Sequence, residues 1–149
     1  MALTKATKLL NFFQNKVSEA KVFEKSILLN IQVDSAKLVD KGSEVNFRLP
    51  VLKEFCNSYG PLHGGAITTI IDETTGLAIL TADKSPRELT SIDLSVSFAS
   101  AAAEGDQLFI KTRCNKVGKN LAFASADLWV GSKLIAEGKH ICYMFNTKL

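Results

Sequence analysis

The sequence has few of the residues on which several common kinds of protein depend. It holds three irregularly spaced cysteines, Cys56, Cys114 and Cys142, and two histidines, His63 and His140. An odd number of scattered cysteines favours neither a disulfide framework nor a zinc site, and two isolated histidines do not complete one. We therefore expect free thiols, a reducing intracellular compartment and no metal centre.

Long apolar runs and concentrated charge are also missing. No run of about 18 apolar residues occurs, so we expect no membrane span. Lys and Arg together number 18 against 15 Asp and Glu, and the basic residues are scattered, which does not favour nucleic acid as a partner. With 149 residues, 46% of them hydrophobic, and no internal repeat, the chain is expected to form one domain over residues 1–149.

Two familiar enzyme motifs are absent, and one unusual segment is present. There is no Gly-x-Ser-x-Gly elbow and no Gly-rich phosphate loop. The segment LHGGAITTIIDETTGLA covers residues 62–78, and no Lys or Arg occurs from Gly64 to Ala82. A surface helix normally has a charged face, so this segment is predicted to be covered by protein on most sides. Its only acids, Asp72 and Glu73, are costly to desolvate there, which points to a function.

Hydrophobic periodicity predicts the elements around this segment. A helix is expected over about 4–24, two strands within 26–50 around a turn at 40–42, and a long helix over 64–82. Alternation of Ile92, Leu94, Val96 and Phe98 predicts a strand with these four side chains on one face. Three further strands are expected near 107–117, 120–130 and 133–145, joined by hairpin turns at 118–119 and 131–132.

These elements predict an α+β fold. The long helix needs a large apolar surface to cover it, and a curved antiparallel sheet of five or six strands is the only such surface that the pattern offers. The expected architecture is therefore a sheet wrapped around one central helix. An open sheet leaves unpaired edge strands, and pairing between subunits is a common remedy, so we expect at least a dimer.

The two termini leave the compartment open. Residues 1–18 contain Lys5, Lys8 and Lys16 and no acid, and they can form an amphipathic helix. This helix either docks on the domain or resembles a mitochondrial targeting segment, and its lack of Arg favours docking. The last residues, Thr147-Lys148-Leu149, are a loose variant of the peroxisomal Ser-Lys-Leu signal. Cytoplasm, mitochondrion and peroxisome all remain possible locations.

Chemistry is expected at two places on the long helix. Gly64 and Gly65 at its start leave N–H groups open to a carbonyl oxygen or an oxyanion, or they simply allow close packing. Asp72 shares a helix face with Thr68, Thr75, Gly76 and Ile79, so it either faces a reaction site or is hydrogen-bonded to a neighbouring element. His63 lies nine positions before Asp72 and faces the opposite way, so the two form no dyad within one chain.

The spacing Asn57-x5-His63-Gly64-Gly65-x6-Asp72, followed by TSIDLSVSF and VGKNLAFASADLW, resembles the hotdog-fold acyl-CoA thioesterases. It is most similar to the phenylacetate-type bacterial enzymes and the small eukaryotic thioesterase superfamily member 2 proteins, over residues 45–142. The resemblance implies a hotdog fold and hydrolysis of acyl-CoA to a free acid and CoA in fatty acid metabolism. It implies no cofactor beyond the coenzyme A of the substrate, and a homodimer that pairs into a dimer of dimers, a homotetramer.

The resemblance also implies roles for individual residues. The Gly64 N–H would polarise the thioester carbonyl, and Asp72 would act as general base on water or as nucleophile. Asn57 would hold the attacking water or the carbonyl, while His63 would support its loop. Ser91 would orient the Asp72 carboxylate and the water, although a neighbouring threonine, Thr90, leaves that register open by one.

Two further segments match regions that contact coenzyme A in the family. These segments are the strand end Phe98-Ala99-Ser100 and the hairpin with Lys116, Gly118 and Lys119. Relatives often continue with proline, a small residue and a basic residue after the first segment, whereas alanines occupy positions 101–103 here. The two lysines are therefore the better candidates for contacting the phosphates.

The spacing on the helix predicts a site shared between subunits. Gly64 and Asp72 lie eight residues apart, which is about 12 Å at 1.5 Å per residue. A carbonyl seat and the base that directs water to it must lie within a few Å of one carbon atom. Antiparallel helices across a two-fold axis would bring Gly64 of one chain beside Asp72 of the other. A hotdog hydratase or dehydratase and a non-catalytic acyl-CoA-binding subunit are the alternative functions.

Overall fold

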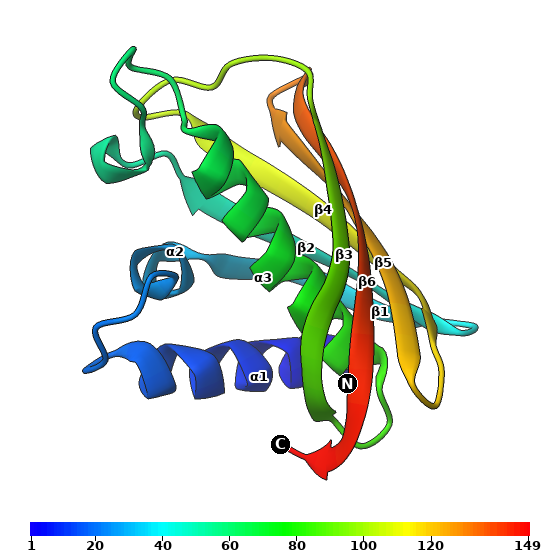
Figure 1. The fold of residues 1–149 in the computed structure, drawn as a ribbon. Coiled ribbons are helices and arrows are strands. Elements are labelled where there is room, and N and C mark those ends of the chain that lie inside the picture. Colours follow the sequence, from blue (N-terminus) through cyan, green and yellow to red (C-terminus); the bar gives the residue numbers. More distant parts are fainter.

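The structure, a computed structural model, describes residues 1–149 as three α-helices, one 3-10 turn and six strands (Figure 1). The helices are α1 (Ala2–Val17), α2 (Lys25–Asn30) and α3 (Gly64–Ala82), and the 3-10 turn η1 covers Lys53–Phe55. The strands are β1 (Gln32–Val39), β2 (Gly42–Pro50), β3 (Arg87–Phe98), β4 (Gln107–Val117), β5 (Leu121–Val130) and β6 (Lys133–Lys148).

All six strands form one antiparallel sheet in the order β1-β2-β4-β5-β6-β3. The sheet curves around α3, while α1 and α2 cover the helix from the side that the sheet leaves open (Figure 1). Strands β1 and β3 are the two edges. This architecture confirms the predicted α+β fold, with a curved antiparallel sheet around one long helix.

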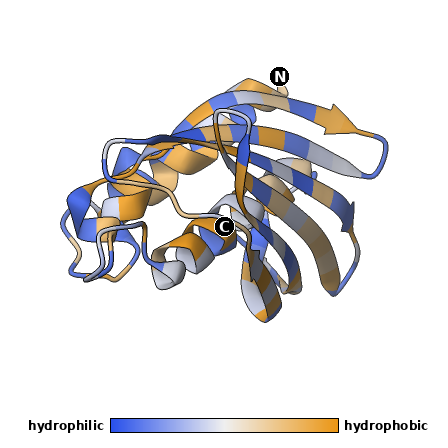
Figure 2. Cartoon of the chain, turned by 90° about the horizontal axis from the view of Figure 1, so that it is seen from above, coloured by the Kyte–Doolittle hydropathy of each residue, from blue (hydrophilic) through white to orange (hydrophobic).

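Helix α3 spans the predicted range, and its burial explains its lack of basic residues. Eleven residues of the helix are buried, and Ile70, Ile71 and Ile79 among them are fully buried. Along the strands, hydrophobic and hydrophilic residues alternate (Figure 2), and β4 and β5 each direct a buried row toward the helix. The apolar length of α3 is thus explained by the sheet, and no helix of the structure is long and apolar enough to cross a membrane.

Two predictions about the first 31 residues are wrong. The first helix ends at Val17 and does not reach residue 24, because the Ser18 hydroxyl donates a 2.8 Å hydrogen bond to the Asn15 carbonyl in the last turn. Residues 26–30, expected as the start of a strand, belong to α2, and β1 begins only at Gln32. Burial of Ile27 and Leu28 on one side of that short helix outweighs the β-propensity of the segment.

A β-bulge changes the expected face of one residue in β3. Ser91 pairs with Cys142 and Asp93 pairs with Ile141, so Ile92 is an extra residue between them. Leu94 still faces α3, whereas the Ile92 side chain is 56% exposed, contrary to the predicted alternation. The bulge also shifts the alternation before it, so that Ser91 faces α3, as does its buried partner Cys142.

Helix α3 and the sheet approach each other closely at Gly138 on β6. A Cβ atom on Gly138 would lie 2.6 Å from Cγ2 of Ile71, well inside van der Waals contact. Gly138 therefore lets α3 lie directly on the strand. Because Ile71 precedes Asp72, this contact fixes the height of Asp72 above the sheet.

Replacing Gly138 with alanine should destabilise the fold by about 1–3 kcal/mol, since overpacking of a dense core costs this much. Ile71→Ala removes the clashing methyl group. In a double-mutant cycle, the double variant should therefore lose less unfolding free energy than the sum of the losses of the two single variants. Chemical denaturation of the four proteins gives the coupling free energy. A Gly138→Ala protein as stable as the wild type would contradict the close approach.

Candidate active site

The Asp72 carboxylate lies at the open side of α3, next to edge strand β3. Its Oδ1 atom accepts a 2.7 Å hydrogen bond from the Ser91 hydroxyl. The Asp72 side chain is 40% exposed and Ser91 is exposed, so both remain accessible from outside this subunit. The Ser91 side chain thus contacts Asp72. Thr90, which pairs with Tyr143, is the adjacent residue and directs its side chain to the other face of the sheet. The bulge at Ile92 is what turns Ser91 toward Asp72.

His140 is a second neighbour of Asp72 that the sequence analysis missed. Its Nε2 atom lies 3.3 Å from Asp72 Oδ1, and its Nδ1 atom lies 2.6 Å from the Thr75 hydroxyl oxygen. The ring is 1% exposed. A usable signal was present, because His140 follows Gly138 by two positions and so occupies the same inward phase of β6.

Burial sets the charge of His140. Desolvation lowers the pKa of the His140 imidazole, although the charges of Asp72 and Asp93 act in the opposite direction. The ring is therefore neutral near pH 7 and carries one proton. With this proton on Nε2, Nε2–H points at the Asp72 carboxylate, and Nδ1 competes with the Ile71 carbonyl, 2.6 Å from the Thr75 hydroxyl oxygen, for the single Thr75 hydroxyl proton. Thr75 and Ile79, expected beside Asp72 on a polar face, are fully buried, so that face is narrower than predicted.

The cysteines near the site do not supply a nucleophile. Cys142 Sγ lies 3.3 Å from His140 Nε2, but burial raises the pKa of the Cys142 thiol to about 12. Burial likewise raises the pKa of Cys114 to about 11. Since the thiolate is the reactive form, both thiols are inert near neutral pH. All three cysteines are unpaired.

The start of α3 presents an unused backbone donor. His63 is the N-cap residue, and its Nδ1 atom accepts a 2.8 Å hydrogen bond from the Gly65 N–H. The Gly64 N–H has no acceptor within the chain. With the positive end of the helix dipole beside it, this N–H can bind a carbonyl oxygen or an oxyanion.

Asn57 lies in the short loop that leads into α3. The loop is closed by a bridge between Cys56 and Leu62 and by a 2.8 Å hydrogen bond from the Asn57 N–H to the Pro61 carbonyl. The Asn57 side-chain oxygen accepts from the Tyr59 N–H at 2.8 Å, which leaves the Asn57 amide group free to donate. The loop thus presents a second donor close in sequence to Gly64.

The two predicted coenzyme A segments lie at opposite ends of α3. The Phe98 ring is 3.4 Å from the position that a Cβ atom on Gly64 would occupy, and Ala99 and Ser100 follow it. At the other end, Arg87 donates to the carbonyls of Gly118 and Lys119, at 3.0 and 2.7 Å. Lys116 and Lys119 are exposed on that hairpin. One chain therefore does not bring all predicted site residues together.

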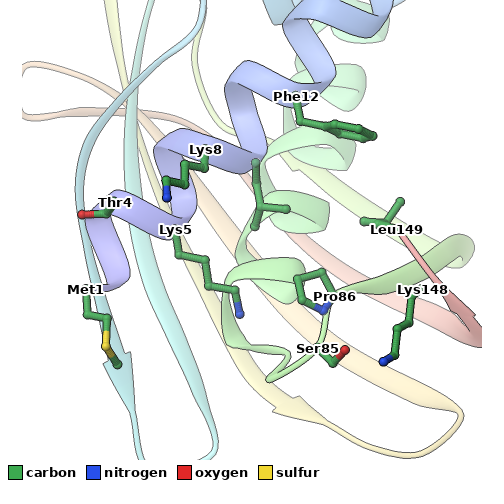
Figure 3. Close-up of a pocket in the computed structure, with 10 residues that line it drawn as sticks. Met1, Thr4, Lys5, Lys8, Phe12, Ser85, Pro86, Lys148 and Leu149 are labelled. Carbon is green, nitrogen blue, oxygen red and sulfur yellow. The ribbon is translucent and has the colours of Figure 1, made fainter.

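The structure has several cavities, and Asp72 lines one of them. A cavity of about 650 Å³ lies between α1, the 85–86 loop and the C-terminal residues (Figure 3), and none of the predicted site residues lines it. A smaller cavity, about 440 Å³, is lined by Asp72, Ser91 and Thr90 and extends along α3. Chemistry by Asp72 would occur at the smaller one. No group of three or more His, Cys, Asp or Glu side chains in the structure could hold a metal ion.

Glu73 lines the same cavity, where its ionised form is unfavourable. Burial, with smaller contributions from the charges of Asp72 and Glu24, raises the pKa of the Glu73 carboxyl from 4.5 to about 7. The folded state therefore binds this proton more tightly than the unfolded state. The corresponding stability is complete below about pH 4.5 and is lost as the pH rises through about 7.

Glu73→Gln should remove this pH dependence. Relative to the variant, the wild type should lose thermal stability between pH 5 and pH 8, because only the wild type must ionise a buried carboxyl. Melting curves over this range, with the loop variant Glu104→Gln as the charge-matched control, measure the difference. Parallel curves for the wild type and Glu73→Gln would show that the Glu73 carboxyl titrates normally.

Comparison with known proteins identifies the family. The family model of the thioesterase superfamily matches residues 59–136. Human acyl-coenzyme A thioesterase 13 is 31% identical over 146 residues, which cover 97% of this chain and 100% of the human protein. The crystal structure of zebrafish thioesterase superfamily member 2 superimposes with a TM-score of 0.78 and 27% identity, covering 93% of this chain and 98% of that one.

A more distant bacterial structure shares the fold. A thioesterase protein from Streptococcus pneumoniae, solved with coenzyme A, superimposes with a TM-score of 0.70 at 19% identity and covers 81% of this chain and 90% of its own. The family model spans just over half of the chain, and the human relative matches nearly all of it. The chain with its central helix, Asp72 and the sheet that encloses them belongs to the thioesterase superfamily and has the hotdog fold.

Proposed function

We propose that this protein hydrolyses acyl-CoA thioesters to a free carboxylic acid and CoA. The observation that supports the proposal best is the Asp72 carboxylate, held by Ser91 at 2.7 Å and beside the neutral His140 ring at 3.3 Å, at the mouth of a cavity. The human relative is named acyl-coenzyme A thioesterase 13, and the streptococcal relative was solved with coenzyme A. Coenzyme A then enters as part of the substrate, and no separate cofactor takes part.

In the proposed reaction Asp72 acts as general base. It accepts a proton from a water molecule while the water oxygen forms a bond to the thioester carbonyl carbon. The carbonyl electrons move onto oxygen, and collapse of this tetrahedral intermediate breaks the C–S bond. The electron pair leaves with sulfur, which takes a proton from Asp72 or from solvent to give CoASH. Ser91 fixes the direction of the carboxylate, and His140 acts behind it as a positioning residue.

The developing oxyanion is assigned to the start of α3. The free Gly64 N–H and the helix dipole both favour negative charge at this point. The Asn57 amide is the second donor near the carbonyl or the water, while the His63 ring caps the Gly65 N–H and leaves the Gly64 N–H without an acceptor. Hydrogen bonds from these donors are stronger in the transition state, where negative charge develops on oxygen, than in the ground state. This difference lowers the barrier of the reaction.

The proposed site is shared by two chains. Gly64 and Asp72 are about 12 Å apart along one helix, so a single chain does not bring them to one carbon atom. Strand β3 is an unpaired edge with Ser91 and the exposed Ile92 on it, and pairing β3 of two copies would extend the sheet and set their α3 helices side by side. The partner would then supply Gly64 and Phe98 beside Asp72 of this chain.

A hydratase is not favoured by this geometry. Such an enzyme needs a histidine that contacts its substrate, whereas His140 is 1% exposed and lies behind Asp72, and His63 is committed to the helix cap. A non-catalytic acyl-CoA-binding protein would bind the same compounds without turnover. Release of free thiol from acyl-CoA in the absence of any other protein separates hydrolysis from both alternatives.

Asp72→Asn should abolish most thiol release while preserving acyl-CoA binding, because it removes the base and nearly keeps the shape. Gly64→Pro removes the N–H donor at the first helical position, where proline is tolerated, and the preceding His63 already has an extended ψ of 137°. Mixing the two inactive proteins should restore roughly a quarter of wild-type activity, because about half of randomly exchanged dimers are mixed and each has one intact pocket.

Two controls make this experiment decisive. Subunit exchange is verified by mass spectrometry of differently tagged copies, and Asp72→Asn mixed with its own tagged copy should stay inactive. If exchanged subunits recover no activity, both residues serve the pocket of one chain and the shared site is wrong. Loss of thiol release in Asp72→Asn alone would still support hydrolysis.

Lys116→Ala/Lys119→Ala should raise KM for acyl-CoA and change kcat little. The exposed hairpin lysines are proposed to contact phosphate groups, which bind equally in the ground state and the transition state. Steady-state kinetics at low salt gives both constants, and Lys21→Ala/Lys25→Ala is the control with the same loss of charge. A lower kcat at unchanged KM would count against a phosphate contact.

A further inference from the structure

The cavity between α1 and the C-terminal residues is built by three segments of the chain (Figure 3). Its walls are the first turns of α1, the loop at Ser85 and Pro86, and the end of β6 with Leu149. The Leu149 N–H donates a 3.0 Å hydrogen bond to the Pro86 carbonyl, which fixes the last two of these walls to each other. The volume of about 650 Å³ is in the usual range for sites that bind small molecules.

The side-chain charges at this cavity are all positive. Lys5, Lys8 and Lys148 line it, and no acidic side chain does. The charged groups at the two ends of the chain, Met1 and Leu149, have opposite signs and therefore leave this excess of positive charge unchanged. Neither Lys8 nor Lys148 forms an ion pair within the chain. An anion in the cavity would therefore meet ammonium groups that have no other partner of opposite charge.

Lys5 is held at the cavity by the end of α3. Its ammonium group donates a hydrogen bond to the carbonyl of Asp83, the residue that caps this end of the helix. Burial lowers the pKa of Lys5, although the charge of Asp83 acts in the opposite direction. The Asp83 carboxylate is itself paired with Arg87 at 2.9 Å. The Lys5 ammonium group has thus lost part of its hydration, and a bound anion would stabilise its charged form.

The cavity has a polar end and an apolar end. In Figure 3, Lys5, Lys148 and the Ser85 hydroxyl group lie at one end, and the Phe12 and Leu149 side chains lie at the other. Phe12 and Leu149 are 47% and 44% exposed, so a ligand between them would remove apolar surface from water. A ligand that satisfies both ends has an anionic head group and an apolar tail.

We propose that this cavity binds the anion of an aliphatic carboxylic acid, with the carboxylate at the polar end and the alkyl tail at the apolar end. A carboxylate accepts hydrogen bonds from ammonium and hydroxyl groups at once, and hydrogen bonds between charged groups are stronger than neutral ones. Acetate would fill only the polar end, and an aliphatic alcohol would leave the ammonium groups without a counter-charge.

This site is separate from the proposed reaction centre. The two cavities share one lining residue, Leu149, and neither Asp72 nor Ser91 lines the cavity at α1. The binding of the acid therefore does not rest on the proposed hydrolysis. A free aliphatic acid is, however, the product of that reaction, so the protein would hold a product molecule outside the place where the thioester is cleaved.

Lys8→Glu/Lys148→Glu should weaken the binding of decanoate by about tenfold or more, because it replaces two charge-assisted contacts by repulsion. Lys21→Glu/Lys25→Glu makes the same change of net charge at lysines that do not line the cavity, and it should bind decanoate as the wild type does. Phe12→Ala, which shortens the apolar wall, should weaken decanoate by about threefold or more. Titration calorimetry with decanoate, acetate and decanol measures these affinities, and melting curves verify that each variant is folded.

The titrations are carried out with protein saturated with S-decyl-CoA, a thioether that cannot be hydrolysed and that occupies the proposed substrate site. Decanoate binding that persists there, and that is lost only in Lys8→Glu/Lys148→Glu and Phe12→Ala, supports the second site even if the wild type releases no thiol from acyl-CoA. Displacement of decanoate by the thioether would place the acid in the substrate site. Equal losses in the two charge variants, no loss in either, or decanol and acetate binding as tightly as decanoate would likewise overturn the proposal.

Discussion

The contact between α3 and β6 at Gly138 controls the geometry of the site. Without a side chain there, Ile71 rests on the strand, and the next helical residue, Asp72, comes within 3.3 Å of His140, two positions along the same strand. Protein interiors are too dense to absorb even a methyl group without displacement. A shift of the helix away from the sheet would therefore separate the carboxylate from His140 and from Ser91 together.

Near this contact, one buried side chain and one exposed side chain together position the Asp72 carboxylate. His140 is buried and neutral, so it stabilises the direction of the carboxylate without cancelling its charge. Ser91 approaches from the exposed edge strand, where a β-bulge turns it inward. The remaining side of Asp72 is open to the cavity and to a second chain. The same edge that completes Asp72 is thus the edge that a partner would cover, which links assembly to catalysis in the proposed mechanism.

Much of the fold and part of the site could be predicted from the sequence. Helix α3 begins and ends where the Lys- and Arg-free stretch and its glycine pair predicted, and the strands near 107–117 and 121–130 follow their alternation closely. The thioesterase resemblance over Asn57, His63, Gly64 and Asp72 led to the correct family. These features depend on local periodicity and spacing, which the sequence contains directly. The catalytic roles of these residues stay predictions.

Other features depended on which strands pair and in what register. The sequence alone determined a long apolar helix, a sheet that must enclose it and an acid on that helix. Only the tertiary structure placed His140 beside Asp72, since they lie 68 positions apart in the sequence, and only pairing with β6 made Ile92 a bulge and turned Ser91 inward. It also distinguished two glycines: a Cβ atom on Gly138 would clash with Ile71, whereas one on Gly76 would meet Leu89 at an ordinary contact distance of 4.0 Å. Side-chain distance across elements is a property of packing, which no local pattern records.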